Sequence, residues 1–156
     1  MVKENFHSDG WLLINKPQGI ESFGVIRKLK FRYSFKKIGF AGTLDPLASG
    51  LLLVGINKAT KKIPNIHQEK KSYEVEIRFG ASTNTLDSEG RFFKMESSSH
   101  NINERVSHLK KFIGTYQQKI PDFSAHKLNG KNFYELARDN KAIEDRYKKV
   151  SVQSLK

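Results

Sequence analysis

The stretch Lys36–Ile56, KKIGFAGTLDPLASGLLLVGI, decides how this chain is organised. Its middle, Gly39–Gly50, holds three glycines and one proline in twelve residues, a density that precludes a regular helix or strand through its centre. We therefore predict a loop there. The apolar run Leu51–Ile56 follows at once and has the length of a buried strand. The one acidic residue of the stretch, Asp45, is thus placed on a loop that leads into the core.

A strand and a helix are predicted on the amino-terminal side of this loop. Trp11–Asn15 is a short apolar run that ends in a turn at Lys16–Gly19, which is typical of a buried strand. Ser22 is a suitable helix cap, and the apolar residues after it recur at helical spacing while the cations between them point elsewhere. These apolar residues are Phe23, Ile26 and Leu29.

Further elements are predicted on the carboxyl-terminal side. In chain order they are a basic helix over Lys58–Asn65 that ends near Pro64, a strand over Ser72–Phe79 with Tyr73, Val75, Ile77 and Phe79 on one face, a surface loop over Met95–Ile102, a helix over Asn103–Phe112 with Val106 and Leu109 inward, a turn at Asn129–Gly130, a helix over Lys131–Arg138 and a strand over Lys148–Val152. Because a terminal strand needs neighbours for its backbone groups, we expect the natural domain to continue beyond Lys156.

Composition limits the class of protein. With 156 residues and an apolar share of 37%, the chain has material for one compact domain with one core. The 28 Lys and Arg outnumber the 16 Asp and Glu, and the net charge of +12 favours a polyanionic partner such as nucleic acid. No apolar run approaches the roughly 20 residues that span a bilayer. The first residues resemble neither a secretory signal nor a transit peptide, so a cytoplasmic location is expected.

Metal and thiol chemistry find no support in the sequence. The chain has no Cys, which excludes disulfides, a thiolate nucleophile and Cys-based zinc sites. Its five His lack the paired spacing of helical metal sites. Taken as isolated residues, Asp45 and Tyr73 each have a plain structural interpretation. The Asp45 side chain would cap the turn before Pro46, and Tyr73 would be a core residue of an amphipathic strand.

Five segments in one order resemble the TruB family of pseudouridine synthases and cover nearly the whole chain. They are Asn15–Gly19 with Ser22, Gly42–Gly50 (GTLDPLASG), Lys70–Tyr73, the run Gly80, Thr83, Thr85, Asp87, Glu89 and Gly90, and the stretch from Ile120 to Arg138 that includes Ser124-Ala125, Lys127, Gly130-Lys131 and Tyr134–Arg138. Nine consecutive positions match in the Asp45 loop alone.

The resemblance implies an α/β (α+β) fold, with a mixed, mostly antiparallel sheet and flanking helices. It identifies residues 1–156 as the amino-terminal part of a pseudouridine synthase catalytic domain. Family members continue into a second half, where the Arg of a GTYIRxL segment pairs with the catalytic Asp, and into a carboxy-terminal RNA-binding region. Neither occurs in this sequence.

The family converts a uridine of the TΨC loop of tRNA, position 55 in tRNA numbering, into pseudouridine without a cofactor or metal. The resemblance makes Asp45 the nucleophile, which attacks the uracil ring or the anomeric carbon. Tyr73 would stack on the extruded base and assist proton transfer at C5. Phe40 stands where the family usually has a His that wedges into the tRNA, so it would keep the stacking surface and lose the polar contact.

Other residues are given supporting roles. Lys16 would form a salt bridge, anchor backbone beneath the site or contact RNA, while structural support would come from Pro17, Gly19, Gly42 and Asp87. Phosphate contacts are expected from Arg27, Lys28, Lys36, Lys37, Lys61, Lys62, Lys127 and Lys131. The expected partner is the T-arm of tRNA, with a monomeric complete protein and no membrane. The alternatives are a non-catalytic module that binds or folds tRNA, and an inactive truncated product.

Overall fold

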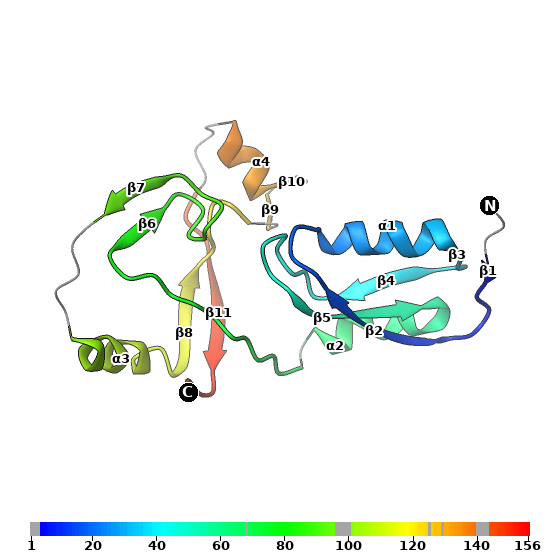
Figure 1. Ribbon diagram of the computed structural model, residues 1–156, viewed down its shortest axis with the longest axis horizontal. Coiled ribbons are helices and arrows are strands. Elements are labelled where there is room, and N and C mark those ends of the chain that lie inside the picture. Colours follow the sequence, from blue (N-terminus) through cyan, green and yellow to red (C-terminus); the bar gives the residue numbers. More distant parts are fainter. Residues whose placement is uncertain (1–3, 68, 96–100, 125, 129, 140–143) are drawn as a thin grey trace. The chain divides into compact units, whose positions relative to one another are not determined.

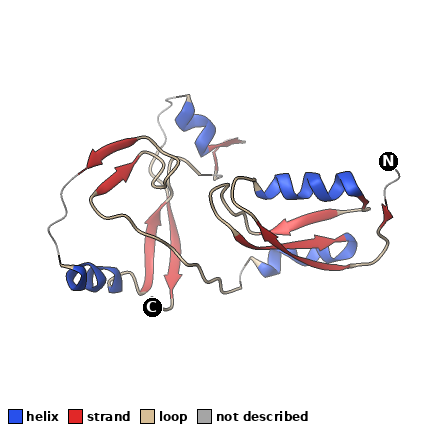
Figure 2. Cartoon of the chain, viewed as in Figure 1, coloured by secondary structure: helices blue, strands red, loops and turns tan. Residues whose placement is uncertain are grey.

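A computed structural model describes residues 4–67, 69–95, 101–124, 126–128, 130–139 and 144–156 (Figures 1 and 2). The chain divides into two compact units, Met1–Val75 and Glu76–Lys156. The sequence had predicted one compact unit rather than two. In the described ranges, no helix combines the length and the apolar character needed to cross a membrane.

The first unit is built on a three-stranded antiparallel sheet. Its order is β2 (Gly10–Lys16), β5 (Gly50–Ile56) and β4 (Ile38–Ala41), so the apolar strand β5 is central. The strands predicted from the two apolar runs are confirmed. The predicted loop, however, begins only after Ala41, because Ile38 and Phe40 pair with β5 and reach the core. Pairing and burial outweigh the weak strand preference of Gly39.

Helix α1 (Ser22–Arg32) covers one face of this sheet (Figure 1). Val25 and Ile26 pack against Leu52 and Val54 of β5, and these four side chains form the buried cluster of the unit. The prediction that Phe23 lies on the apolar face is wrong, because the inward face is centred on Val25 and Ile26 and Phe23 stays 55% exposed.

Short elements complete the unit. The 3₁₀ helix η1 (Asn57–Lys62) leads into α2 (Ile63–Ile66), which packs near Gly39 on the other sheet face. The predicted end at Pro64 is wrong: a proline fits the first turn of a helix, where its missing N–H has no helical partner to lose. The strands β1 (Glu4–Asn5) and β3 (Tyr33–Ser34) pair in parallel.

The predicted strand Ser72–Phe79 is not formed. Residues 70–78 have no regular structure, and Tyr73 and Val75 are both 70% exposed. The alternation of polar and apolar residues is present, but a strand also requires a partner for its backbone groups, and the described part of the chain provides none here.

In its described residues, the second unit has three antiparallel strand pairs and two helices. The pairs are β6 (Ala81–Thr83) with β7 (Phe92–Met95), β8 (Gly114–Lys119) with β11 (Tyr147–Val152), and β9 (Lys127–Leu128) with β10 (Lys131–Asn132); the helices are α3 (Ile102–Lys110) and α4 (Phe133–Arg138). Among the described residues, its buried apolar side chains are Ile120 and Phe133.

Most predictions in the second unit hold for element type. The helix α3 and the terminal strand β11 are confirmed, but Val106 is exposed rather than inward. The helix α4 begins at Phe133, because Lys131 belongs to the preceding hairpin. Most of the predicted loop Met95–Ile102, and Asn129 of the predicted turn, lie outside the described residues. The fold is α+β with mostly antiparallel pairing, as expected.

Candidate active site

The loop from Gly42 to Ser49 joins β4 to β5 and carries Asp45. Gly42 has a φ of 77°, a backbone conformation that glycine adopts without strain, and this lets the chain leave β4 sharply. The carbonyl oxygen of Asp45 accepts a hydrogen bond from the amide of Ala48 at 3.0 Å, which closes a tight turn. Asp45 is exposed at this turn.

Ser22 binds the loop immediately before Asp45. Its hydroxyl donates to the carbonyl oxygen of Leu44 at 3.0 Å and accepts from the amide of the same residue at 2.9 Å. The predicted capping role is wrong: Glu21 occupies the N-cap position, and Ser22 lies in the first turn of α1 with its side chain 1% exposed. The start of α1 is thereby joined to the Asp45 loop.

Lys16 lies beneath the loop, at the end of β2, and is completely buried. Its ammonium donates to the carbonyl oxygens of Pro17 at 3.0 Å, Ile20 at 2.8 Å and Pro46 at 3.4 Å. No carboxylate pairs with it among the described residues, so the salt-bridge alternative is wrong. Because the ammonium is enclosed by carbonyl oxygens, Lys16 anchors backbone and is not an RNA contact.

The turn after Lys16 is the third feature, after Ser22 and Lys16, that is bonded to the Asp45 loop. The amide of Gly19 donates to the carbonyl oxygen of Pro46 at 2.8 Å, with Gly19 at a φ of 79°. Gly19 thus holds the Asp45 loop directly, whereas Pro17 is linked to it through the Lys16 ammonium.

The Asp45 carboxylate has no partner in the part of the chain that the structure describes. Within the described ranges no hydrogen bond or ion pair reaches its oxygens, and the turn is closed by its backbone instead. The alternative that the side chain caps the turn is therefore wrong. An exposed carboxylate on a turn held by these hydrogen bonds is accessible from solvent, and a carboxylate can act as a nucleophile.

Comparison with known proteins agrees with this geometry. Residues 29–156 match the model of the TruB family pseudouridylate synthase (N terminal domain). This chain belongs to the TruB family. The match begins within α1 and includes the whole Asp45 loop.

Two relatives of this chain share the name tRNA pseudouridine synthase B. A tRNA pseudouridine synthase B of Ruegeria sp. (strain TM1040) is 41% identical over 135 residues, which are 86% of this chain and 45% of that protein. The protein of that name from Aquifex aeolicus (strain VF5) is 40% identical over 147 residues, which are 94% of this chain and 51% of that protein. The chain spans about half the length of the curated relatives that it matches.

The two aromatic residues expected to contact the tRNA lie in different parts of the first unit. Phe40 lies in β4 and packs partly against the core cluster of α1 and β5. Tyr73 lies in the extended segment after α2 and is 70% exposed. The structure describes no contact between Tyr73 and Asp45, so it does not assemble the expected pair.

The eight cationic residues that were expected to contact phosphates are all exposed. Six lie in the first unit and two in the β9–β10 hairpin of the second; they are Arg27, Lys28, Lys36, Lys37, Lys61, Lys62, Lys127 and Lys131. Within the described residues, no group of three or more His, Asp or Glu side chains is arranged to hold a metal ion.

Asp87 has a local structural role. Its carboxylate accepts hydrogen bonds from the hydroxyl of Thr85 at 2.6 Å and from the amide of Glu89 at 2.9 Å. Its carbonyl oxygen accepts from the hydroxyl of Thr83 at 2.7 Å. Asp87 therefore orders the connection between β6 and β7, as a side chain with short-range backbone bonds does in turns.

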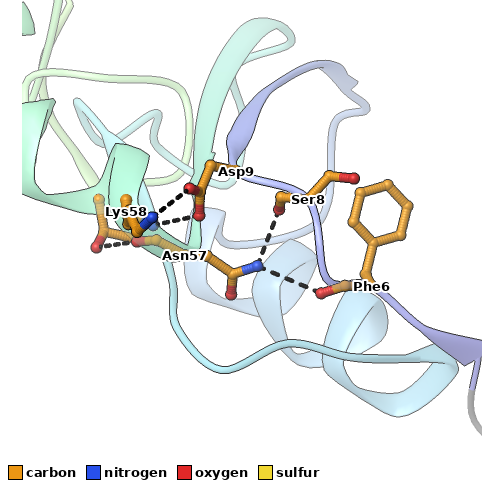
Figure 3. Close-up of polar contacts among 6 residues, drawn as sticks. Phe6, Ser8, Asp9, Asn57 and Lys58 are labelled. Carbon is orange, nitrogen blue, oxygen red and sulfur yellow. Dashed lines mark hydrogen bonds and ion pairs between the residues drawn. The ribbon is translucent and has the colours of Figure 1, made fainter.

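Asn57 was missed by the sequence analysis. It is buried directly after β5, and its amide nitrogen donates to the carbonyl oxygens of Phe6 at 3.3 Å and Ser8 at 2.9 Å (Figure 3). Its side-chain oxygen accepts from the amide of Lys37 at 3.2 Å. Its φ of 51° is one that Asn tolerates better than most residues. An Asn immediately after an apolar strand was the available signal.

Proposed function

We propose that this chain supplies the nucleophile of a tRNA pseudouridine synthase and that Asp45 is that nucleophile. The observation that carries the proposal is the exposed carboxylate of Asp45, which has no partner in the described chain and stands on a loop held by Lys16, Gly19 and Ser22. Relatives named tRNA pseudouridine synthase B and the family match agree with it.

The reaction is an isomerisation and needs no other reactant. The Asp45 carboxylate adds to the uracil ring or to ribose C1′, the C1′–N1 bond breaks, and a C1′–C5 bond forms. The proton on C5 is lost, N1 takes up a proton, and the carboxylate is released unchanged. The substrate of this proposal is the TΨC-loop uridine of tRNA, and no cofactor or metal takes part.

Tyr73 is proposed to stack on the extruded base and to assist the proton transfer at C5. Its high exposure leaves the ring available for that contact, and stacking on an aromatic side chain is worth about 1–3 kcal/mol per base. An arginine of the kind that the family resemblance implies would orient the unpartnered carboxylate, because opposite charges attract strongly where water is excluded.

The exposed cations are proposed to bind the phosphates of the T-arm. Each contact steepens the dependence of binding on salt by about one unit. The complete protein is proposed to be a cytoplasmic monomer. A non-catalytic module that binds tRNA is the second candidate, because the chain spans only about half of its relatives. Filter retention with tRNA at low and high salt tests that binding.

The experiment that tests the nucleophile is an isomerisation assay on a tRNA transcript, read by mass spectrometry of pseudouridine. The complete protein forms pseudouridine in the TΨC loop, and Asp45→Asn in the complete protein abolishes it. Asp122→Asn, which changes an exposed Asp of the second unit, is the control. Normal isomerisation by the Asp45→Asn chain overturns the assignment, whereas salt-sensitive tRNA binding without isomerisation by the unchanged chain supports the second candidate.

A further inference from the structure

The outer face of α1 carries an aromatic and cationic stripe. Phe23, Arg27 and Phe31, here called the α1 stripe, are spaced four residues apart and therefore lie along one side of the helix. Phe23 is 55% exposed and Phe31 is 71% exposed, and Arg27 between them is exposed as well. Two large apolar rings on the water side of a helix whose other face is already buried need a separate explanation.

The charge of the helix points to an anionic partner. Its eleven residues include four cations and no Asp or Glu; the cations are Arg27, Lys28, Lys30 and Arg32. On one flank of the helix, Lys28 and Arg32 border a hollow of about 370 Å³ whose other lining residues include Ile14, Ile20 and Leu29. Cations therefore lie beside the stripe as well as in it.

The α1 stripe already shows the kind of stacking that it offers. The guanidinium of Arg27 lies 5.7 Å from the centre of the Phe23 ring, which is a cation–π contact. A planar group with delocalised electrons can occupy the remaining ring faces in the same manner. Unpaired nucleotides combine such planar bases with phosphates, and proteins bind them through aromatic platforms in cationic surroundings. In duplex RNA the base faces are stacked on one another and are closed to such contacts.

We propose that the α1 stripe is a stacking platform for unpaired nucleotides of RNA, with phosphates held by the neighbouring cations. This inference rests on the proposed RNA substrate and adds to it a preference for single-stranded segments. Phe23 and Phe31 are eight residues apart, which is about 12 Å along a helix. That length corresponds to roughly three or four stacked nucleotides of one strand.

The test is fluorescence anisotropy with two labelled probes, a short uridine oligonucleotide and a short RNA duplex. The unchanged chain binds the oligonucleotide more tightly than the duplex. The double variant Phe23→Ala, Phe31→Ala weakens binding to the oligonucleotide by about fivefold or more and leaves duplex binding unchanged. The double variant Phe23→Trp, Phe31→Trp keeps the affinity for the oligonucleotide, because both positions still carry an aromatic ring. Arg27→Ala lowers the salt slope of binding by about one.

The control is Phe93→Ala, which removes a ring that is 68% exposed in β7 of the second unit. Circular dichroism confirms that each variant is folded. Equal affinity of the double variant and the unchanged chain for the oligonucleotide overturns the stacking platform. The stacking platform is also overturned if the double variant loses binding to vesicles of anionic lipid but keeps its binding to RNA. Neither result depends on pseudouridine formation, so failure of the proposed function is recognised separately, in the tRNA isomerisation assay.

Discussion

The hydroxyl of Ser22 holds both backbone groups of Leu44, its carbonyl oxygen at 3.0 Å and its amide at 2.9 Å. One side chain that binds the N–H and the C=O of a single residue restricts both backbone dihedrals of that residue. Leu44 directly precedes Asp45, so the first turn of α1 fixes the point from which the candidate nucleophile projects.

Ser22→Ala is expected to leave both backbone groups of Leu44 without this partner in a partly buried place. The free energy of unfolding should fall by about 1–3 kcal/mol, the cost of unsatisfied buried groups. Urea unfolding followed by the fluorescence of Trp11, the one tryptophan, measures it. Ser34→Ala, which changes an exposed Ser in β3, is the control. Equal unfolding midpoints for Ser22→Ala and the unchanged chain would contradict the role given to the hydroxyl.

Lys16→Met is expected to destabilise the first unit although it removes a buried charge. Three carbonyl oxygens lose the ammonium as a donor, and the oxygen of Pro46 keeps the amide of Gly19; hydrogen bonds to charged groups are worth about 1.5–3 kcal/mol. We expect a net loss of about 2 kcal/mol, because the desolvation cost of the ammonium is removed at the same time. Lys30→Met on the exposed side of α1 should change little. A Lys16→Met chain as stable as the Lys30→Met chain would show that the carbonyl oxygens do not need the ammonium.

Asn57 offers a test that separates backbone from side chain. Asn57→Gly keeps the left-handed backbone without strain but removes three side-chain hydrogen bonds, whereas Asn57→Ala removes these bonds and adds strain. Both should lower the free energy of unfolding, and Asn57→Ala by about 1 kcal/mol more than Asn57→Gly. Thermal unfolding of the two variants in parallel gives the difference. If Asn57→Gly matches the unchanged chain, the side-chain bonds contribute no stability.

Asp9 should add a component of stability that depends on acid. The amide of Lys58 donates to its carboxylate at 3.0 Å and the Lys58 ammonium lies 3.5 Å away, so the pKa of Asp9 is below its ordinary value of 3.8. A lowered pKa in the folded chain means that the contribution is present above pH 3.8 and is lost as pH falls through the folded value.

Urea midpoints above and below this pH provide the measurement. Asp9→Asn should show a smaller fall in stability on acidification than the unchanged chain. Glu74→Gln, in the extended segment, should fall as the unchanged chain does. An identical acid response of Asp9→Asn and the unchanged chain would mean that the contact with Lys58 adds nothing in solution.

The sequence predicted elements well where burial alone decides them. The strand β5 was recognised because its apolar run is nearly continuous, as a central strand requires, and β2 for the same reason. The prediction of a strand over Ser72–Phe79 was wrong. Alternation of polar and apolar residues indicates which side chains share a face, but it does not provide a neighbouring strand for the backbone groups. Phe23 was misplaced because spacing alone does not reveal which of two overlapping helical faces meets the sheet.

The candidate site was predicted in part. Family resemblance marked the Asp45 loop, Lys16 and Ser22, but the sequence left the role of Lys16 open and gave Ser22 a capping role. Both roles depend on contacts across long separations, such as Ser22 with Leu44 and Lys16 with Pro46. Such contacts follow from how β2 and β5 pair, which local sequence does not contain.

Among the described residues, the hydrogen bonds that anchor the Asp45 loop reach its main chain, at Leu44 and Pro46. Within the same part of the chain, the exposed side chains of Thr43 and Ser49 make no hydrogen bond that holds the loop. Thr43 and Ser49 can therefore be exchanged while the carboxylate of Asp45 stays in place. In evolution and in library design, substitutions of these neighbours can therefore alter substrate preference, because the hydrogen bonds that position Asp45 do not depend on their side chains.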